Sequence, residues 1–254
     1  MNLLDHCIIP DWPAPANVKA LQTTRVGGGS VAPYDSFNLG DHVGDAPLSV
    51  ARNRMLLNTL LPSEPVWLQQ VHSTVVANAD MASCLPRADA CIARHRAAVC
   101  VVMTADCLPV LLCDTQGSVV GAAHAGWKGL AAGVIEATVQ AMAIEPQNLM
   151  AWMGPAIGQD AFEVGDEVRA AFVSAHPQSA QAFIAGLSGK WFADIYALAR
   201  LRLNALGITR IYGGGYCTFR ETERFFSYRR DGATGRMGTF IWLEYPGPPR
   251  PPLV

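Results

Sequence analysis

Three side chains with metal-binding chemistry stand in short phrases that also contain small, polar or aromatic residues. His72 ends Gln-Gln-Val-His, Cys107 lies in Thr-Ala-Asp-Cys-Leu-Pro, and His124 lies in Ala-Ala-His-Ala-Gly-Trp-Lys-Gly. Two imidazoles and one thiolate would form a three-ligand set, in which zinc keeps a fourth position for water or substrate. The spacing alone leaves a structural role equally open, because a Cys in an apolar stretch commonly packs as a small core residue. That core role is our prediction for Cys84, Cys91, Cys100 and Cys113.

The surrounding sequence predicts that each candidate ligand follows a strand. The predicted strands run over 66–69 before His72, 99–103 before Cys107 and 119–123 before His124. Strand ends that converge on one cleft are a common way to build a metal or active site. Further strands are predicted at 109–113, 148–153 and 239–243, and helices at 47–61, 129–142, 165–175 and 194–206. Asp45 is available to cap the first helix, and Pro47 suits its first turn. Helices and strands without strict alternation predict an α/β fold with mixed sheets.

A second group of residues is suited to binding an anion. Thr23-Thr24-Arg25 runs into the glycine-rich loop at 27–29, whose backbone N–H groups can form a concave anion seat. Arg229 and Arg230 follow an aromatic run, and a guanidinium is a natural clamp for phosphate or carboxylate. Asn38 either binds a ligand or ties down its own loop. The candidate substrate- and phosphate-binding residues are therefore Arg25, Asn38, Arg229 and Arg230.

Composition excludes several classes of function. The formal net charge is −2 with no long basic run, so we expect no nucleic-acid partner. No apolar stretch reaches the roughly 20 residues that span a bilayer, so we expect no membrane association. Seven cysteines without close doublets, and a start without a secretory signal pattern, predict reduced thiols in a cytoplasmic protein. The absence of Gly-x-Gly-x-x-Gly and of the zinc-deaminase signature argues against a nicotinamide or flavin cofactor and against that deaminase class.

These phrases together resemble the YfiH family, whose members are also labelled laccase-domain or multicopper polyphenol oxidase proteins and, more recently, purine nucleoside phosphorylases. The matching phrases run in order along nearly the whole chain. They are Thr23-Thr24-Arg25, Asn38-Leu39-Gly40, Gln69 to His72, Thr104 to Pro109, Ala123 to Trp127, Phe162 to Gly165, Cys217-Thr218, Phe225 to Arg230 and Thr234 to Arg236. Departures at Ala93 and Gln159-Asp160 put substrate preference in doubt more than the chemistry.

The resemblance implies a zinc site formed by His72, Cys107 and His124. It also implies one domain over residues 1–254, with a four-layer α/β/β/α fold similar to that of cysteine hydrolases. Family members are described as phosphorylases of adenosine, inosine and methylthioadenosine that also deaminate adenosine. We therefore expect a zinc-dependent purine nucleoside phosphorylase with accompanying adenosine deaminase activity, and with purine nucleosides and phosphate as its small-molecule partners.

Three other functions stay open at this point. A four-copper oxidase needs roughly ten imidazole ligands, and the chain has six histidines. A polyphenol oxidase could therefore contain at most a single copper centre in this chain. If no metal binds, Cys107 and His124 could instead act as nucleophile and base in amide hydrolysis, which would suit the role in peptidoglycan precursor editing proposed for a member of the family that the chain resembles. A metal-binding scaffold protein without catalysis is the third alternative.

Overall fold

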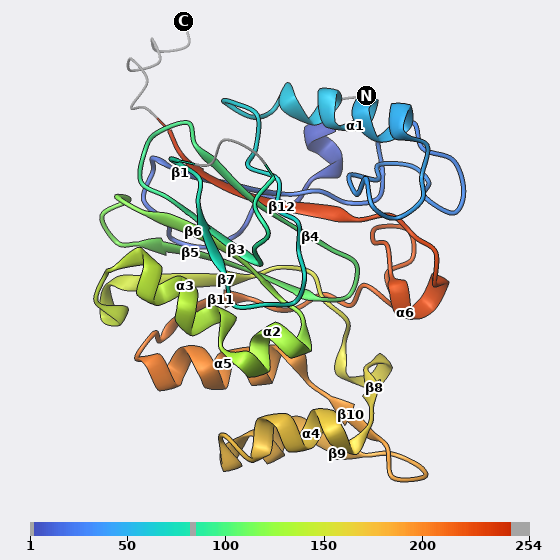
Figure 1. Cartoon of the computed structure of the whole chain (residues 1–254), viewed down its shortest axis with the longest axis vertical. Coiled ribbons are helices and arrows are strands. Elements are labelled where there is room, and N and C mark those ends of the chain that lie inside the picture. The colour runs from blue at the N-terminus through green and yellow to red at the C-terminus, as the bar shows by residue number, and fades with distance from the viewer. Residues whose placement is uncertain (1–2, 82–84, 245–254) are drawn as a thin grey trace, which may run out of the picture.

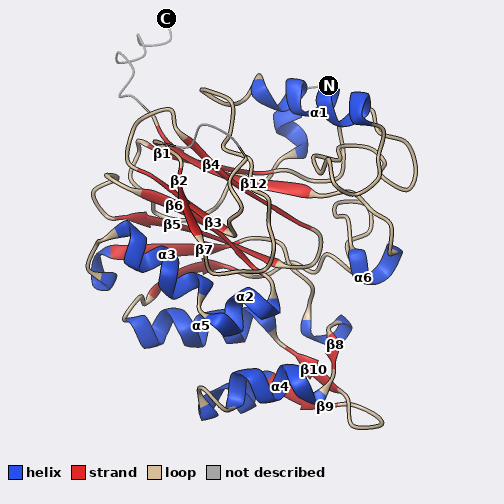
Figure 2. Ribbon diagram, viewed as in Figure 1, coloured by secondary structure: helices blue, strands red, loops and turns tan. Residues whose placement is uncertain are grey.

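A mixed six-stranded sheet forms the centre of the computed structural model, which describes residues 3–81 and 85–244 (Figures 1 and 2). Across this sheet the strands follow the order β11 (Arg210–Gly213), β7 (Leu149–Met153), β5 (Leu108–Asp114), β6 (Val120–Ala125), β3 (Ala90–Ala93) and β2 (Val76–Asn78). The inner strands pair antiparallel, whereas the edge strands β11 and β2 pair parallel with their neighbours. The predicted α/β class with mixed sheets is therefore confirmed.

A smaller antiparallel sheet packs on one face of the central sheet. Its strands follow the order β1 (Val18–Gln22), β12 (Met237–Leu243) and β4 (Val99–Thr104). Side chains alternate between the two faces of a strand, so Cys100 of β4 packs with Leu111 and Trp152 of the central sheet. Val101, one residue further on, packs with Leu57 of helix α1 (Pro47–Asn58) on the opposite face. The small sheet is thus enclosed between α1 and the central sheet.

Helices cover the other face of the central sheet (Figure 1). They are α2 (Trp127–Ala132), α3 (Val134–Met142) and α5 (Ile195–Leu206), which share the largest apolar cluster with β5, β6 and β7. The predicted helix at 129–142 is broken into α2 and α3 at Gly133, whose φ of 99° lies in the left-handed region that favours glycine. The chain therefore forms two short helices here in place of the single predicted one.

A third, small sheet lies beside the central one and carries helix α4 (Asp166–Val173) on it (Figure 1). Its strands are β8 (Glu163–Val164), β10 (Trp191–Ala193) and β9 (Phe183–Ala185). The remaining elements are the 3-10 turns η1 (Leu3–His6), η2 (Pro146–Asn148), η3 (Gln159–Ala161) and η4 (Pro177–Ala182), and the short helix α6 (Tyr228–Asp231). Within residues 3–81 and 85–244, no helix has the length and apolar character needed to cross a membrane.

Most of the predicted elements are confirmed. The strands predicted at 99–103, 109–113, 119–123, 148–153 and 239–243 and the helices predicted at 47–61, 165–175 and 194–206 correspond to β4, β5, β6, β7, β12, α1, α4 and α5. Asp194 caps α5 by accepting a hydrogen bond from the Ala197 N–H. Cys91, Cys100 and Cys113 are buried as predicted, while Cys84 lies outside the described residues.

Two local predictions were wrong. The segment 66–69 makes one isolated bridge, between Val66 and Cys100, and is not a strand. Trp67 is buried against α1 and the small sheet, and Leu68 is buried between the two sheets. Burial of this segment therefore does not require sheet pairing. Asp45 does not cap α1, whose N-cap residue is Ala46. The Asp45 carboxylate accepts hydrogen bonds from Ser30 and Asn38 instead.

Candidate metal centre and its cavity

His72, Cys107 and His124 meet at one point of the structure, as the sequence predicted. Their donor atoms all lie within 4.8 Å of one another. Cys107 occupies the turn between β4 and β5, and the register of β5 with β6 pairs Pro109 with His124. His72 arrives from a loop, where its φ of 60° turns the chain toward the other two ligands. The three side chains therefore come from separate segments that the two packed sheets bring together.

One buried carboxylate, that of Asp89, holds both histidines. Its Oδ1 lies 2.9 Å from His124 Nδ1, and its two oxygens accept hydrogen bonds from the backbone N–H groups of Val71, His72 and Ser73. The left-handed turn at His72 is thereby fixed by hydrogen bonds. A carboxylate on Nδ1 places the imidazole proton there and leaves Nε2 of His124 as the free donor atom.

The charges around the site shift the pKa values of both histidines. Burial lowers the pKa of His124, but the negative charge of Cys107 and the hydrogen bond to Asp89 outweigh it and raise this pKa to about 9. The pKa of His72 is lowered, first by burial and then by the nearby charge of His124. The pKa of Asp89 is lowered despite its burial, because His124 and Ser73 donate hydrogen bonds to the carboxylate. His72 is thus favoured in its neutral, ligand-competent form, whereas a metal ion that binds Nε2 of His124 would displace a proton from that nitrogen.

Gly126 leaves the space that the three ligands need. A Cβ atom there would lie 2.6 Å from His72 Nδ1 and 2.9 Å from Cys107 Sγ. The φ of Gly126 is −62°, which any residue can adopt, so the requirement for glycine comes from space and not from backbone conformation. Glycine before α2 therefore serves the site directly.

The donor set fits a single metal ion. Zinc bonds of about 2.0–2.1 Å to nitrogen and 2.3 Å to sulfur separate tetrahedral donors by roughly 3.3–3.7 Å. The donor atoms of His72, Cys107 and His124 lie within 4.8 Å of one another, which is close to that spacing. Two imidazoles and one thiolate suit zinc and are also the ligands of blue copper, so the donor types admit either metal.

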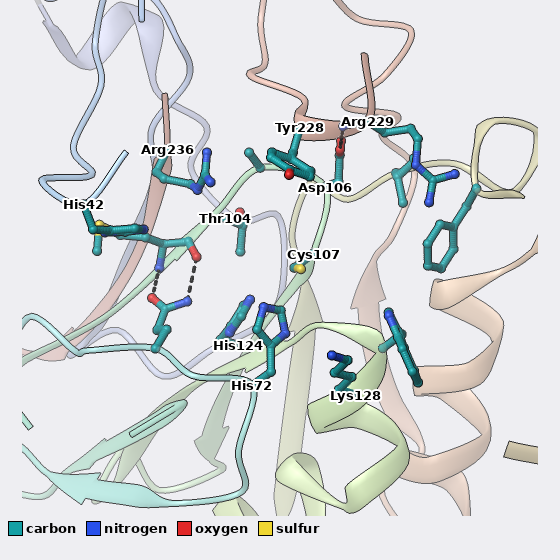
Figure 3. A pocket seen from close by; sticks show the side chains of 16 residues that line it. His42, His72, Thr104, Asp106, Cys107, His124, Lys128, Tyr228, Arg229 and Arg236 are labelled. Atoms are coloured by element: carbon teal, nitrogen blue, oxygen red, sulfur yellow. Dashed lines mark hydrogen bonds between the residues drawn. The ribbon is translucent and has the colours of Figure 1, made fainter. Parts of the chain in front are cut away.

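The three ligands line a cavity of about 570 Å³, the size of a small-molecule site. Figure 3 shows them at its centre, with cationic side chains from distant parts of the chain around them. The other lining residues are His42, Gln70, Met103, Thr104, Ala105, Asp106, Trp127, Lys128, Ile157, Phe162, Tyr228, Arg229 and Arg236. Asp106 is held by the Thr218 hydroxyl and the Arg229 N–H, which fix the turn that carries Cys107.

Of the four residues predicted to bind substrate or phosphate, Arg229 lines this cavity. The Arg25 guanidinium pairs with Asp35 and borders a separate pocket. Arg230 donates to the carbonyls of Thr218, Phe219 and Phe225 and to Asp231. Neither arginine is brought to the cavity.

Asn38 is fully buried and does not line the cavity itself, but it holds the backbone of Arg236, which does. Its Oδ1 accepts hydrogen bonds from the backbone N–H groups of Gly40 and Arg236. Arg236 lines the cavity, and a Cβ at Gly40 would lie 2.8 Å from its Cγ. The segment Asn38-Leu39-Gly40 therefore fixes the backbone of Arg236 and leaves space for its side chain.

Sequence reasoning missed Arg236, Thr104, Trp127, Lys128 and Phe162 as cavity residues. Four of them, Arg236, Thr104, Trp127 and Phe162, lie inside the phrases that carried the family resemblance, which is the signal that could have found them, and Lys128 directly follows one of these phrases. Taken one at a time, each has the pattern of an ordinary core or surface residue. Their common cavity arises only from the folded arrangement.

Fold and site together define a mixed α/β protein with a group of three side chains that could hold a metal ion. The family described as multi-copper polyphenol oxidoreductase laccase matches residues 19–244. The chain therefore belongs to this family, which includes the YfiH proteins.

Individual relatives match over nearly their whole length. The purine nucleoside phosphorylase YfiH of Escherichia coli strain K12 is 53% identical over 243 residues, which is 94% of this chain and 100% of that protein. A purine nucleoside phosphorylase of Pseudomonas aeruginosa is 53% identical over 238 residues, covering 93% and 98% of the two chains. A crystal structure of a Neisseria meningitidis DUF152 protein superposes with a TM-score of 0.92 at 53% identity, covering 94% and 100%. YlmD from Geobacillus stearothermophilus gives a TM-score of 0.84 at 31% identity, covering 92% and 94%.

Proposed function

We propose that this protein is a zinc-dependent purine nucleoside phosphorylase that acts on adenosine, inosine and methylthioadenosine. The observation that carries the proposal is the grouping of His72, Cys107 and His124 in a cavity that also holds cations and aromatic rings. Relatives named purine nucleoside phosphorylase, which match nearly the whole chain, support it. The cytoplasm, where nucleosides and phosphate are both present, is the proposed location.

The reaction sets the groups that the cavity must supply. A phosphate oxygen forms a bond to C1′ of the ribose, and the bond from C1′ to the base nitrogen breaks with its electron pair on the base. The proton of hydrogen phosphate ends on the base, so ribose 1-phosphate and a neutral purine leave. In the transition state positive charge develops on the ribose and negative charge develops on the departing base. Catalysis therefore needs a positioned phosphate and a polar environment for the departing base.

The residues of the cavity can meet these needs. Arg229, Arg236 and Lys128 supply positive charge that attracts phosphate and stabilises the departing base. Trp127 and Phe162 offer ring faces against which a purine can stack and exclude water. Asp89 keeps the Nδ1 proton of His124 in place while the other ring nitrogen serves as donor atom.

Zinc, when bound by His72, Cys107 and His124, would supply Lewis-acid polarisation of a substrate oxygen. Copper is the alternative metal for the same donors, as the family description suggests. Adenosine deamination is part of the proposal, because the purine and an attacking water would meet in the same cavity. The phosphate requirement separates the two reactions.

The test is ribose 1-phosphate release from adenosine by zinc-loaded wild type and by Cys107→Ala. We expect release that requires phosphate, and loss of both zinc and release in the variant. Cys217→Ala is the matched control, since Cys217 is half-buried like Cys107 and lies outside the cavity. Full zinc content with full activity in Cys107→Ala would contradict the ligand assignment.

A Cys–His amide hydrolase remains the second candidate, because a thiol and an imidazole, Cys107 and His124, place their sulfur and nitrogen atoms within 4.8 Å of each other in the cavity. The packing of α1, two sheets and the helices behind them supports a four-layer, cysteine-hydrolase-like, single-domain interpretation of the chain. This candidate predicts turnover of peptidoglycan-precursor amides that persists with chelator and is lost in Cys107→Ala. Phosphate-dependent, chelator-sensitive nucleoside cleavage would exclude it.

A further inference from the structure

The cavity has cations at two ends, which differ in the groups beside them. One end has the rings of Phe162 and Trp127, while the other has Thr104 and the Tyr228 ring, whose centre lies 6.0 Å from Arg236 Cζ. Figure 3 shows Arg236 and His42 on one side of Cys107, and Arg229 and Lys128 on the other. The two ends therefore offer different surfaces to the two halves of a bisubstrate reaction.

At one end the cations lie against aromatic rings. Arg229 Cζ is 5.5 Å from the centre of the Phe162 ring, and its Nη1 donates to the Glu163 carbonyl. Lys128 Nζ is 5.7 Å from the centre of the Trp127 ring. Aromatic rings together with cations suit a planar heteroaromatic base better than a compact anion.

At the other end, the Arg236 guanidinium has donor positions that no described protein group uses. Arg236 Nη1 donates to the carbonyls of Thr234 and Gly235, while within residues 3–81 and 85–244 its Nε and Nη2 have no hydrogen-bond acceptor. The guanidinium forms no ion pair with a carboxylate of these residues. Its stem is fixed by Asn38 behind the backbone and by the space at Gly40. Two donor positions of a held guanidinium are thus available to a ligand.

A buried hydroxyl lies beside this guanidinium. Thr104 ends β4 and pairs with Met237 in β12, so the strand register places it next to Arg236. Its side chain is 1% exposed, lines the cavity, and carries an Oγ1 atom without a hydrogen-bond partner. A buried polar group without a partner is costly unless a ligand or water satisfies it. Figure 3 shows Thr104 between Arg236 and Cys107.

The Asp106 carboxylate also lines the cavity. The two oxygens of Asp106 accept hydrogen bonds from the Thr218 hydroxyl and from the Arg229 backbone N–H. His42, which is exposed at the rim, adds a further donor on the same side as Arg236.

We propose that Arg236 and the Thr104 hydroxyl form the phosphate subsite, with the nucleoside base at the Phe162–Trp127 end. This assignment rests on the proposed phosphorylase function and names the side of the metal centre from which phosphate attacks. Arg236 presents a fork of two N–H donors to two phosphate oxygens, and Thr104 donates its hydroxyl to one of them. Phosphate then stands beside Cys107, with the ribose between it and the aromatic end.

The test measures inorganic phosphate binding directly, by calorimetry on zinc-loaded protein, and the phosphate and nucleoside KM values in the phosphorolysis assay. Thr104→Val keeps the shape of the side chain and removes only the hydroxyl; we expect the phosphate Kd and KM to rise about tenfold. Arg236→Met keeps the packed stem, and we expect a rise of about 100-fold or more. The nucleoside KM should stay within about twofold in both variants. Thr138→Val, a fully buried change on α3 outside the cavity, is the control.

The outcomes separate this subsite from the proposed function. Phosphate affinity that is unchanged in both variants, or a rise confined to the nucleoside KM, would overturn the subsite even if phosphorolysis is real. Phosphate binding that weakens in both variants, in a wild type that releases no ribose 1-phosphate, would support the anion subsite and reject the phosphorylase. A wild type that neither binds phosphate nor cleaves nucleosides would reject both.

Discussion

Asp89 connects the two histidines of the candidate metal centre without being a ligand itself. It is fully buried, hydrogen-bonds His124 Nδ1, and accepts backbone N–H groups on both sides of His72. A single carboxylate therefore sets the orientation of one imidazole and the path of the chain that presents the other. Carboxylates in this position fix the tautomer and the direction of a ligating histidine.

Replacing Asp89 with Asn should weaken zinc binding by about 10- to 100-fold. The single oxygen of the asparagine amide cannot accept hydrogen bonds from His124 Nδ1 and from the backbone N–H groups of residues 71–73 together. Both the His124 ring and the His72 loop would therefore lose their alignment. Chelator competition measures the affinity. Asp80→Asn is the control, because Asp80 is also a largely buried carboxylate that accepts two backbone N–H groups, from Arg94 and His95, away from the cavity. Equal zinc affinity in Asp89→Asn and Asp80→Asn would contradict the positioning role.

At the scale of elements, the start of α2 is shaped by the site. Gly126 stands between the end of β6, which carries His124, and the first residue of α2. A side chain at this point would enter the space of His72 and Cys107, although the backbone conformation there suits any residue. The close approach of helix and ligands therefore depends on one missing Cβ atom.

Gly126→Ala should abolish stoichiometric zinc binding while the metal-free protein stays folded. The added methyl group would lie within 2.9 Å of donor atoms on two ligands, so at least one of them must move away. Zinc titration and thermal unfolding of the metal-free variant separate the two effects. Gly29→Ala provides the comparison, since a Cβ there meets no atom within 4 Å. Normal zinc binding by Gly126→Ala would show that the ligands are less closely packed than described.

At the scale of the whole molecule, the cavity collects residues from His42 to Arg236, across both packed sheets and the loops around them. A ligand set of this kind exists only in the folded chain, so metal binding is coupled to folding. An ion present at 1,000 times its Kd adds about 4 kcal/mol to the free energy of unfolding.

Zinc at that excess should therefore raise the Tm of the metal-free protein by roughly 8–16 °C, given the size of the chain. Differential scanning calorimetry with and without zinc measures the shift. The Cys107→Ala variant should show little of it, while Cys217→Ala should keep it. An equal shift in Cys107→Ala would place the stabilising ion elsewhere on the molecule.

The sequence predicted the elements and the three candidate ligands better than it predicted the cavity. Strands such as β5 and β6 are short, apolar and bounded by turn residues, so their local pattern is sufficient. Arg25 and Arg230 have the same local signal as a cavity arginine, but their guanidinium groups are used by backbone carbonyls and carboxylates that only the fold brings near. Arg236 reaches the cavity because Asn38, 198 residues earlier, holds its backbone. A hydrogen bond between residues so far apart in the sequence leaves no local sequence pattern from which it could be predicted.

The most direct test of the account is the zinc X-ray absorption spectrum of the loaded wild-type protein. Two histidines and one cysteine predict a single sulfur at about 2.3 Å and two imidazole nitrogens at about 2.0–2.1 Å, with a remaining light-atom ligand. A zinc shell without sulfur, or with two or more sulfurs, would contradict the centre formed by His72, Cys107 and His124.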